Sequence, residues 1–172
     1  MNQHPVSRFI KHGLFYSLLF IVSGCISLST FLPSSKIKKA ENVKFLQVPN
    51  PYKSISNPGI DRAWQNYTNG NTLAFSSECD LQTDLTLKAI EQENLSALND
   101  LKILDSQLIT FNEREGLETV AEGQVDGVSI RIALVIFKKN NCNFTLSYVG
   151  RKKYFESDLP IFKTFKEGFR VP

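Results

Sequence analysis

The sequence predicts an α+β fold in which a central antiparallel sheet is flanked by helices. Seven segments have the apolar content and turn-residue boundaries of strands, and two have apolar residues at helical spacing. Their order is three strands, a helix, four strands and a second helix. A sheet covered by helices suits that order, because each element can then bury its apolar face.

The first three strands are expected to be short and to end at turn signals. They are predicted over 43–48, 61–67 and 72–79, and two nearby prolines stop the first of them. The turn-forming sequence Thr68-Asn69-Gly70-Asn71 separates the second from the third. We therefore expect these two strands to form a hairpin.

The first helix is predicted over 84–101, with Thr83 or Asp84 as the cap of its first turn. Its apolar stripe consists of Leu87, Ile90, Ala97, Leu98 and Leu101. Its solvated face consists of Lys88, Glu91, Glu93 and Asp100. The spacing of both sets is that of an amphipathic helix packed on a sheet.

Four strands follow, over 103–111, 116–125, 128–137 and 142–149. Asp126-Gly127 joins the second to the third and is a strong hairpin signal, because both turn residues need a positive φ. The strand over 128–137 has apolar residues on both faces, so it should be central and covered on both sides.

The last helix is predicted over 158–167. Asp158 would cap this helix, and Pro160 is tolerated in its first turn. Three phenylalanines at helical spacing form its buried face: Phe162, Phe165 and Phe169. The helix should pack these rings against one face of the sheet.

Several of these features together resemble a known group of proteins. They are Cys79 at a strand end, the long helix, Asp126-Gly127, the strand VSIRIALVIF, the KKNNC turn and the three spaced phenylalanines. This succession is similar to uncharacterised bacterial lipoproteins with a PsbP-like (Mog-type) α/β/α sandwich, over residues 43–172. The resemblance implies the fold and a habit of binding protein partners, and it supplies no catalytic residues. Nothing in the sequence supports the photosystem role of PsbP itself.

The N-terminal quarter has the pattern of a lipoprotein signal. Two cations precede an uncharged apolar run over 14–22, and Val22-Ser23-Gly24-Cys25 follows. This tetrapeptide resembles the bacterial lipobox, which implies removal of residues 1–24, lipidation of Cys25 and acylation of its new amino group. Ile26 rather than Asp follows the cysteine, which favours the outer membrane facing the periplasm over the inner membrane.

A single transmembrane anchor over 14–32 is the alternative interpretation, because that stretch has no charge. Its serines and the cations on both flanks favour the lipoprotein. We expect residues 25–41 to be a lipidated tether and residues 42–172 to be the folded domain. Lys36, Lys38 and Lys39 of the tether would either rest on anionic head groups or solubilise a linker.

The cysteines and histidines narrow the chemistry. Apart from Cys25 the chain has two cysteines, Cys79 and Cys142, each in phase with apolar neighbours on a strand. An exported chain with this even remainder favours a disulfide between them, and two separate buried thiols are the alternative. Both histidines precede Cys25, so the mature chain would have no Ser-His-Asp or Cys-His system and no His-containing metal site.

The charge and motifs exclude further classes. Arg8 and Lys11 are the only charged residues before Cys25, so the net charge would fall from +3 to +1 on processing. That is too weak a field to predict nucleic-acid binding. The chain has no Gly-rich phosphate loop, no CxxC and no EF-hand spacing. We expect neither cofactor nor metal.

Two groups of residues remain as candidate sites. A possible interaction surface consists of Trp64, Tyr67, Arg151, Lys152 and Lys153. Aromatic rings and cations of this kind suit an acidic partner or a lipid head group, although core packing and edge protection also explain them. An acidic patch consists of Glu113, Glu115, Glu118 and Glu122, with Arg114 among them. Paired carboxylates of this kind could serve as acid and base or hold Ca²⁺, and the alternative is the ordinary charge of solvated strand ends.

The sequence thus favours a lipid-anchored cell-envelope protein that is not an enzyme. It would act as a binding or assembly-accessory module, held to the membrane by its lipid and bound to a protein partner. One alternative is a periplasmic carrier of a small apolar ligand, which requires a deep dry pocket. The other is a His-free carboxylate hydrolase, which requires two acidic side chains facing each other in a cleft.

Overall fold

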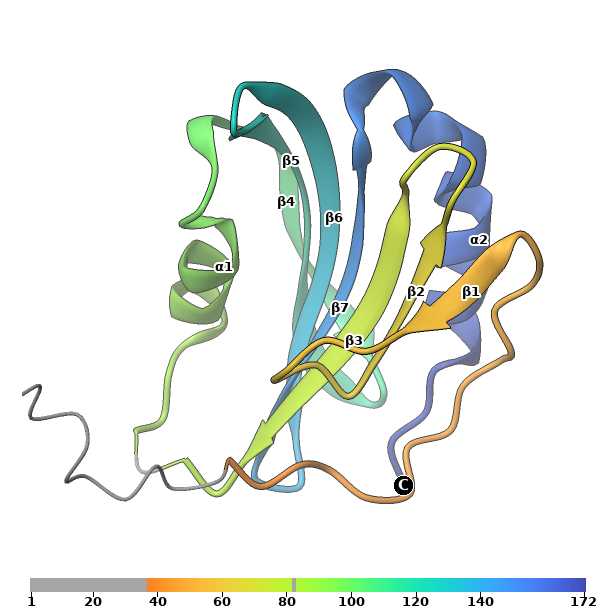
Figure 1. Cartoon of the computed structure of the whole chain (residues 1–172). Helices are drawn as coiled ribbons and strands as arrows, with labels where there is room; N and C mark the ends of the chain where they lie inside the picture. The colour runs from red at the N-terminus through yellow and green to blue at the C-terminus, as the bar shows by residue number, and fades with distance from the viewer. Residues whose placement is uncertain (1–36, 82) are drawn as a thin grey trace, which may run out of the picture. The chain divides into compact units, whose positions relative to one another are not determined.

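The computed structural model describes residues 37–81 and 83–172. Its seven strands form one antiparallel sheet in the order β1-β2-β3-β7-β6-β5-β4, with one helix on each face (Figure 1). The first strands are β1 (Tyr52–Ile55), β2 (Arg62–Asn66) and β3 (Thr72–Cys79). The others are β4 (Asn99–Phe111), β5 (Arg114–Val125), β6 (Val128–Lys139) and β7 (Cys142–Arg151). The helices are α1 (Leu87–Leu95), the 3-10 helix η2 (Lys152–Tyr154) and α2 (Phe155–Gly168). The predicted sheet flanked by helices is therefore confirmed.

The strand β6 separates two apolar cores, as its sequence predicts. Ile132, Leu134 and Ile136 pack with α1 on one face, where Ile90 and Leu95 meet the sheet. The alternate residues of β6 pack on the other face with the rings of Phe162, Phe165 and Phe169. Side chains alternate between faces along a strand, so this one strand supplies both cores.

Both predicted hairpins are present. Strands β2 and β3 pair directly, and β5 pairs with β6 through the turn Asp126-Gly127. The φ angles of this turn are 49° and 75°, in the left-handed region that a two-residue hairpin requires. Aspartate and glycine tolerate this region better than most residues.

The strand predicted over 43–48 is wrong. The segment has a single bridge, between Lys44 and Arg170, and the first strand is β1 instead. The segment is rich in apolar residues because Phe45 and Val48 pack into the core of the α2 face. Phe45 lies 5.3 Å from Phe75 of β3 and 5.8 Å from Phe165 of α2 between ring centroids, so the apolar residues fill the space between sheet and helix and do not pair in the sheet.

The helix predicted over 84–101 is also wrong in its length. It begins after the cap Thr86, whose side chain accepts from the backbone N–H of Ala89, and it ends at Leu95. Residues 99–101 belong to β4, so the helical spacing of Leu98 and Leu101 is coincidental. The turn after Leu95 redirects the chain into the edge of the sheet.

Glu91 is buried, although its position predicted a solvated side chain. It is 1% exposed and faces β4 and β5. Its Oε1 accepts hydrogen bonds from Ser106, at 3.1 Å, and from Thr119, and its other oxygen pairs with Lys88. Burial opposes ionisation, but Lys88 and the two hydroxyls outweigh it and lower the pKa of Glu91. These polar partners offset the free-energy cost of removing the Glu91 carboxylate from water.

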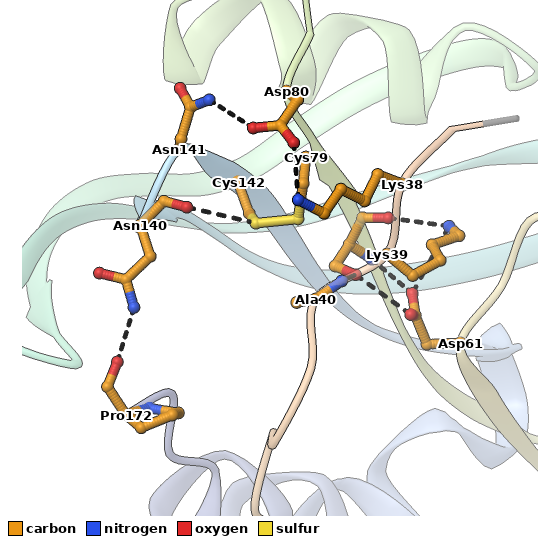
Figure 2. The surroundings of a disulfide bond; sticks show 11 residues. Lys38, Lys39, Ala40, Asp61, Cys79, Asp80, Asn140, Asn141, Cys142 and Pro172 are labelled. Atoms are coloured by element: carbon orange, nitrogen blue, oxygen red, sulfur yellow. Dashed lines mark hydrogen bonds and ion pairs between the residues drawn. A yellow bond between two sulfur atoms is a disulfide. The ribbon is translucent and has the colours of Figure 1, made fainter. Parts of the chain in front are cut away.

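The predicted disulfide between Cys79 and Cys142 is present (Figure 2). The two residues stand directly opposite each other at the ends of β3 and β7, with their Cα atoms 4.0 Å apart. Both are buried on the α2 face. The bond therefore joins the strands covalently at one end of the sheet.

The N-terminal segment is attached beside this disulfide (Figure 2). Lys38 forms an antiparallel bridge with Cys79, and its ammonium lies 3.0 Å from Asp80. Lys39 donates to the carbonyl of Ser77 at 2.8 Å, and its Nζ lies 3.6 Å from Asp61. These contacts cover the part of β3 that extends beyond its pairing with β2.

The predicted signal sequence, with Cys25 and most of the tether, lies outside the described residues. The transmembrane alternative lies there as well. Within the part of the chain that the structure describes, no helix is long and apolar enough to cross a membrane.

Candidate functional site

Three chain turns lie at the same end of the sheet (Figure 1), opposite the end at which Lys38 bridges to Cys79. They are the β2–β3 turn, the β5–β6 turn and η2, which leads from β7 into α2. The exposed apolar, aromatic and basic side chains here form the distal surface: Tyr67, Val125, Val128, Arg151, Lys152, Lys153 and Tyr154. Tyr67 is 65% exposed and Val128 is 44% exposed. Large apolar side chains and cations are thus displayed together.

The three cations of the distal surface differ in their partners. Lys152 lies 3.0 Å from Glu122, and this pairing is the main cause that lowers the pKa of that carboxyl. Lys153 lies 4.5 Å from the ring centroid of Tyr154, a cation–π contact. Among the described residues, neither Arg151 nor Lys153 has a carboxylate partner. Two cations therefore remain available to an acidic group.

A buried polar cluster fixes the distal surface from beneath. Asp158 Oδ2 accepts hydrogen bonds at 3.0–3.1 Å from Tyr52 and from the amides of Asn66, Asn69 and Asn71. Burial opposes ionisation of this carboxyl, but the four hydrogen bonds outweigh it and lower its pKa. The cluster ties the β2–β3 turn to the first turn of α2.

Asn71 extends the cluster toward η2. Its amide also donates to Tyr148 Oη at 2.9 Å and to the carbonyl of Tyr154 at 3.0 Å. A β-carbon at Gly150 would overlap Asn71 Oδ1, so only glycine leaves room for this amide. The side chains that position Tyr67 and Tyr154 are thus connected through one buried residue.

The sequence predicted that Asp158 caps the last helix, and this prediction is wrong. The helix begins at Phe155, so Asp158 lies within its first turn, where a negative charge suits the helix dipole. The sequence indicated Asn69 and Asn71 only as turn residues and did not connect them with Asp158. Their clustering around Asp158 depends on tertiary contacts, since Asn71 and Asp158 are 87 positions apart in the sequence.

Trp64 lies apart from the other predicted surface residues. Its ring is half-buried on the α2 face, 5.5 Å from Phe45 and 5.7 Å from Phe165 between centroids. The structure brings Tyr67, Arg151, Lys152 and Lys153 to one end of the sheet and packs Trp64 against the core cluster. Core packing accounts for Trp64.

Three glutamates of the acidic patch are dispersed into separate ion pairs. Glu118 lies 2.6 Å from Lys166, Glu113 lies 3.7 Å from Lys139, and Glu122 faces Lys152. Within residues 37–81 and 83–172, no cluster of His, Cys, Asp and Glu could hold a metal ion. These carboxylates therefore balance nearby cations.

Two hollows bear on ligand binding. An open groove of about 680 Å³ lies between the end of β4 and the end of α2, and charged side chains line much of it, including Glu118 and Lys166. A more apolar pocket of about 190 Å³ lies between Leu46, Val48, Pro160 and Phe165. The volume of this second pocket is below the roughly 300–1,000 Å³ of most ligand sites.

No family model matches the chain, and no curated protein is similar to it in sequence. The solution structure of cyanobacterial PsbP (CyanoP) from Synechocystis is similar, with a TM-score of 0.55, 11% identity and coverage of 76% of this chain and 86% of that chain. This likeness shows a PsbP-like fold and confirms the fold that the resemblance implied.

Two further structures have scores below 0.5. One is PA94 from Pseudomonas aeruginosa, a protein of unknown function, with a TM-score of 0.49, 14% identity and coverage of 77% and 83%. The other is LpqN of Mycobacterium tuberculosis, which is involved in cell envelope biogenesis. Its TM-score is 0.46 and its identity is 10%, with coverage of 79% of this chain and 82% of that chain. Neither adds to the assignment of the fold.

Proposed function

We propose that the chain is a lipid-anchored, non-catalytic module of the cell envelope that binds a protein partner through its distal surface. The observation that carries the proposal is the grouping at one end of the sheet of exposed apolar side chains with Arg151 and Lys153, two cations for which the described residues supply no carboxylate partner. Protein interfaces favour aromatic residues and arginine in this way. The partner therefore offers a surface with apolar side chains and at least one carboxylate.

The anchor in this proposal is the lipid on Cys25, facing the periplasm from the outer membrane. It is supported by the sequence Val22-Ser23-Gly24-Cys25 after a short apolar run. The disulfide is consistent with an oxidising compartment. Because the N-terminal segment joins the sheet at Lys38, the distal surface lies at the opposite end of the sheet from this attachment point.

The two alternatives have less support. A carrier needs more room than the apolar pocket of about 190 Å³ offers. A carboxylate hydrolase needs two free acidic groups in a cleft, whereas Glu113 and Glu118 in the large groove each face a lysine. Binding through the distal surface uses side chains that are already exposed.

Site-specific photo-crosslinking in cells that express the full chain tests the binding surface. A photoreactive residue at Tyr67 or Tyr154 should give the same crosslinked protein. The band should weaken severalfold when Arg151→Glu and Lys153→Glu are added. Leu46, which is 51% exposed near the end of α2, is the matched control position. Equal crosslinking at Leu46 and at the distal positions would refute the proposed surface.

The anchor is tested separately with Cys25→Ala. The variant should accumulate as a full-length precursor, should not incorporate an alkyne-labelled fatty acid and should leave the membrane fraction. Retention of the label and of the wild-type mobility would show that Cys25 is not the lipidated residue. This outcome would leave the crosslinking result unaffected.

A further inference from the structure

The two edges of the sheet are protected to different degrees. The edge strand β1 has four residues and follows Pro49 and Pro51, so it offers little backbone for pairing. The other edge strand, β4, has 13 residues (Figure 1). Among the described residues, no strand or loop pairs with the outward side of β4. A long edge of this kind is a template for another strand.

The two halves of β4 also differ. The first half has two register shifts against β5, between Asn99 and Lys102 and between Ile103 and Asp105. Such bulges discourage edge pairing. The second half pairs regularly with β5 over seven residues, from Asp105 to Phe111, without Pro or Lys. The regular half is therefore the part suited to accept a strand.

Exposed apolar side chains are concentrated on this strand. Leu101, Ile103, Leu104 and Leu108 are all large, apolar and at least 39% exposed. Leu108 is 64% exposed and stands at the centre of the regular half. A second strand beside β4 would cover Leu108 and pair the outward backbone groups at the same time.

We propose that a second copy of this chain pairs with β4 along residues 105–111, antiparallel, about a twofold axis through Leu108. An axis at the central residue pairs all seven residues of one copy with the same seven of the other. Leu108 then faces Leu108 of the second copy, and Ser106 faces Thr110. Hydroxyl pairs and apolar pairs at opposite positions stabilise antiparallel strands. No like charges stand opposite each other in this register, because Asp105 faces Phe111.

The charges beyond the paired segment select this occupant. The register shift at Leu104 removes one residue from the ladder, so Lys102 comes level with the β4–β5 turn of the second copy, which contains Glu113. Lys102 is exposed, and among the described residues it has no ion-pair partner. The Glu113 side chain is 91% exposed and lies 3.7 Å from Lys139, so it can contact a second cation from outside. The twofold axis repeats this contact, so an ammonium meets a carboxylate at each end of the seam. Unlike an arbitrary strand, a second copy supplies both matches. The pairing does not depend on the proposed lipid anchor or on the distal surface.

Cysteine crosslinking in lysates of cells that express the full chain tests the register. Leu108→Cys places two thiols directly opposite each other across antiparallel strands, as Cys79 and Cys142 are in the native sheet. Mild oxidation should therefore give a covalent dimer on a non-reducing gel. Thr110→Cys is the matched control, since its two copies would lie four residues apart along the strand, roughly 13 Å, too far for a disulfide. The unsubstituted chain, which contains Cys25, sets the background.

A charge reversal tests the occupant with the same readout. Lys102→Glu should lower the yield of the Leu108→Cys dimer about fivefold, because two opposite-charge contacts become repulsive. Adding Glu113→Lys should restore the yield, and Lys53→Glu on the opposite edge should leave it unchanged. No dimer above background, equal yields at positions 108 and 110, or no recovery in the double reversal would each overturn the proposal.

Discussion

The buried carboxylate of Asp158 leads to a quantitative prediction. Its Oδ2 accepts four hydrogen bonds, and three of the donors, Tyr52, Asn66 and Asn71, are at most 5% exposed. In Asp158→Asn the remaining carbonyl oxygen can accept two of them, and Asn71 keeps Tyr148 Oη and the Tyr154 carbonyl as acceptors. One donor therefore loses its acceptor, and the two remaining hydrogen bonds lose their charged acceptor. A buried unpaired donor costs about 1–3 kcal/mol, and hydrogen bonds to a charged group are worth about 1 kcal/mol more than neutral ones, so we expect a loss of about 2–4 kcal/mol. That is a large part of the roughly 5–15 kcal/mol of a small domain.

Urea unfolding measured by tryptophan fluorescence is a suitable assay, because Trp64 is the only tryptophan and packs between Phe45 and Phe165. Glu156→Gln is the matched control, since the Glu156 side chain is 68% exposed on the same helix. The control should change the free energy of unfolding by about 1 kcal/mol at most. An equal loss in both variants would refute the role of the buried cluster.

The pH dependence of the difference in unfolding free energy between wild type and Asp158→Asn tests the role of the Asp158 charge. The folded pKa of Asp158 is lowered, so its ionised form stabilises the protein above the unfolded pKa of about 4. This stabilisation is lost as the pH falls through the folded pKa. The difference between wild type and Asp158→Asn should therefore be full at pH 7 and shrink below about pH 4. A constant difference between pH 7 and pH 3 would contradict ionisation as the cause.

Three further perturbations follow from the packing. Replacing Cys79 and Cys142, which are 63 positions apart, should lower the free energy of unfolding by about 2–4 kcal/mol in urea titrations, somewhat below the chain-entropy value of about 4 kcal/mol; reductant should reproduce the loss in the wild type. Glu91→Gln should lower the free energy of unfolding by about 1–3 kcal/mol in thermal unfolding. The control Glu93→Gln, at an exposed position of the same helix, should lower it by no more than about 0.5 kcal/mol. Gly150→Ala should lower the free energy of unfolding by about 1–3 kcal/mol, because the new methyl displaces Asn71. Amide hydrogen exchange should become faster in the β2–β3 turn before it does elsewhere. Wild-type exchange in that turn would contradict this reading.

Most strands could be predicted from the sequence because their signal is local. The alternation in β6 reports burial on two faces, and the turn Asp126-Gly127 reports a backbone geometry that few residues accept. The disulfide could be predicted because both cysteines fall on the apolar phase of their strands. In each case, neighbouring residues carry the physical constraint.

The errors occur where distant parts of the chain decide the outcome. Phe45 and Val48 make residues 43–48 as apolar as a strand, but Phe45 packs between the sheet and α2 without pairing in the sheet. Glu91 is charged, and it can be buried because β4 and β5 supply the hydroxyls of Ser106 and Thr119 as its hydrogen-bond donors. The candidate surface was predicted in part, since runs of exposed cations are visible in the sequence. The hydrogen bonds beneath it, centred on Asp158, link residues too far apart to be recognised there.

The disulfide also determines how the chain would respond to mechanical force. A pull applied through Lys38 and resisted at the C-terminus reaches Cys79 and then crosses directly to Cys142. The intervening residues, with α1, β4, β5 and β6, form a covalent loop outside the load path. They amount to roughly 200 Å of extended chain that cannot lengthen until the bond is reduced. Only the segments before Cys79 and after Cys142 can be drawn out, so the edge strand β4 is shielded from tension on the N-terminus.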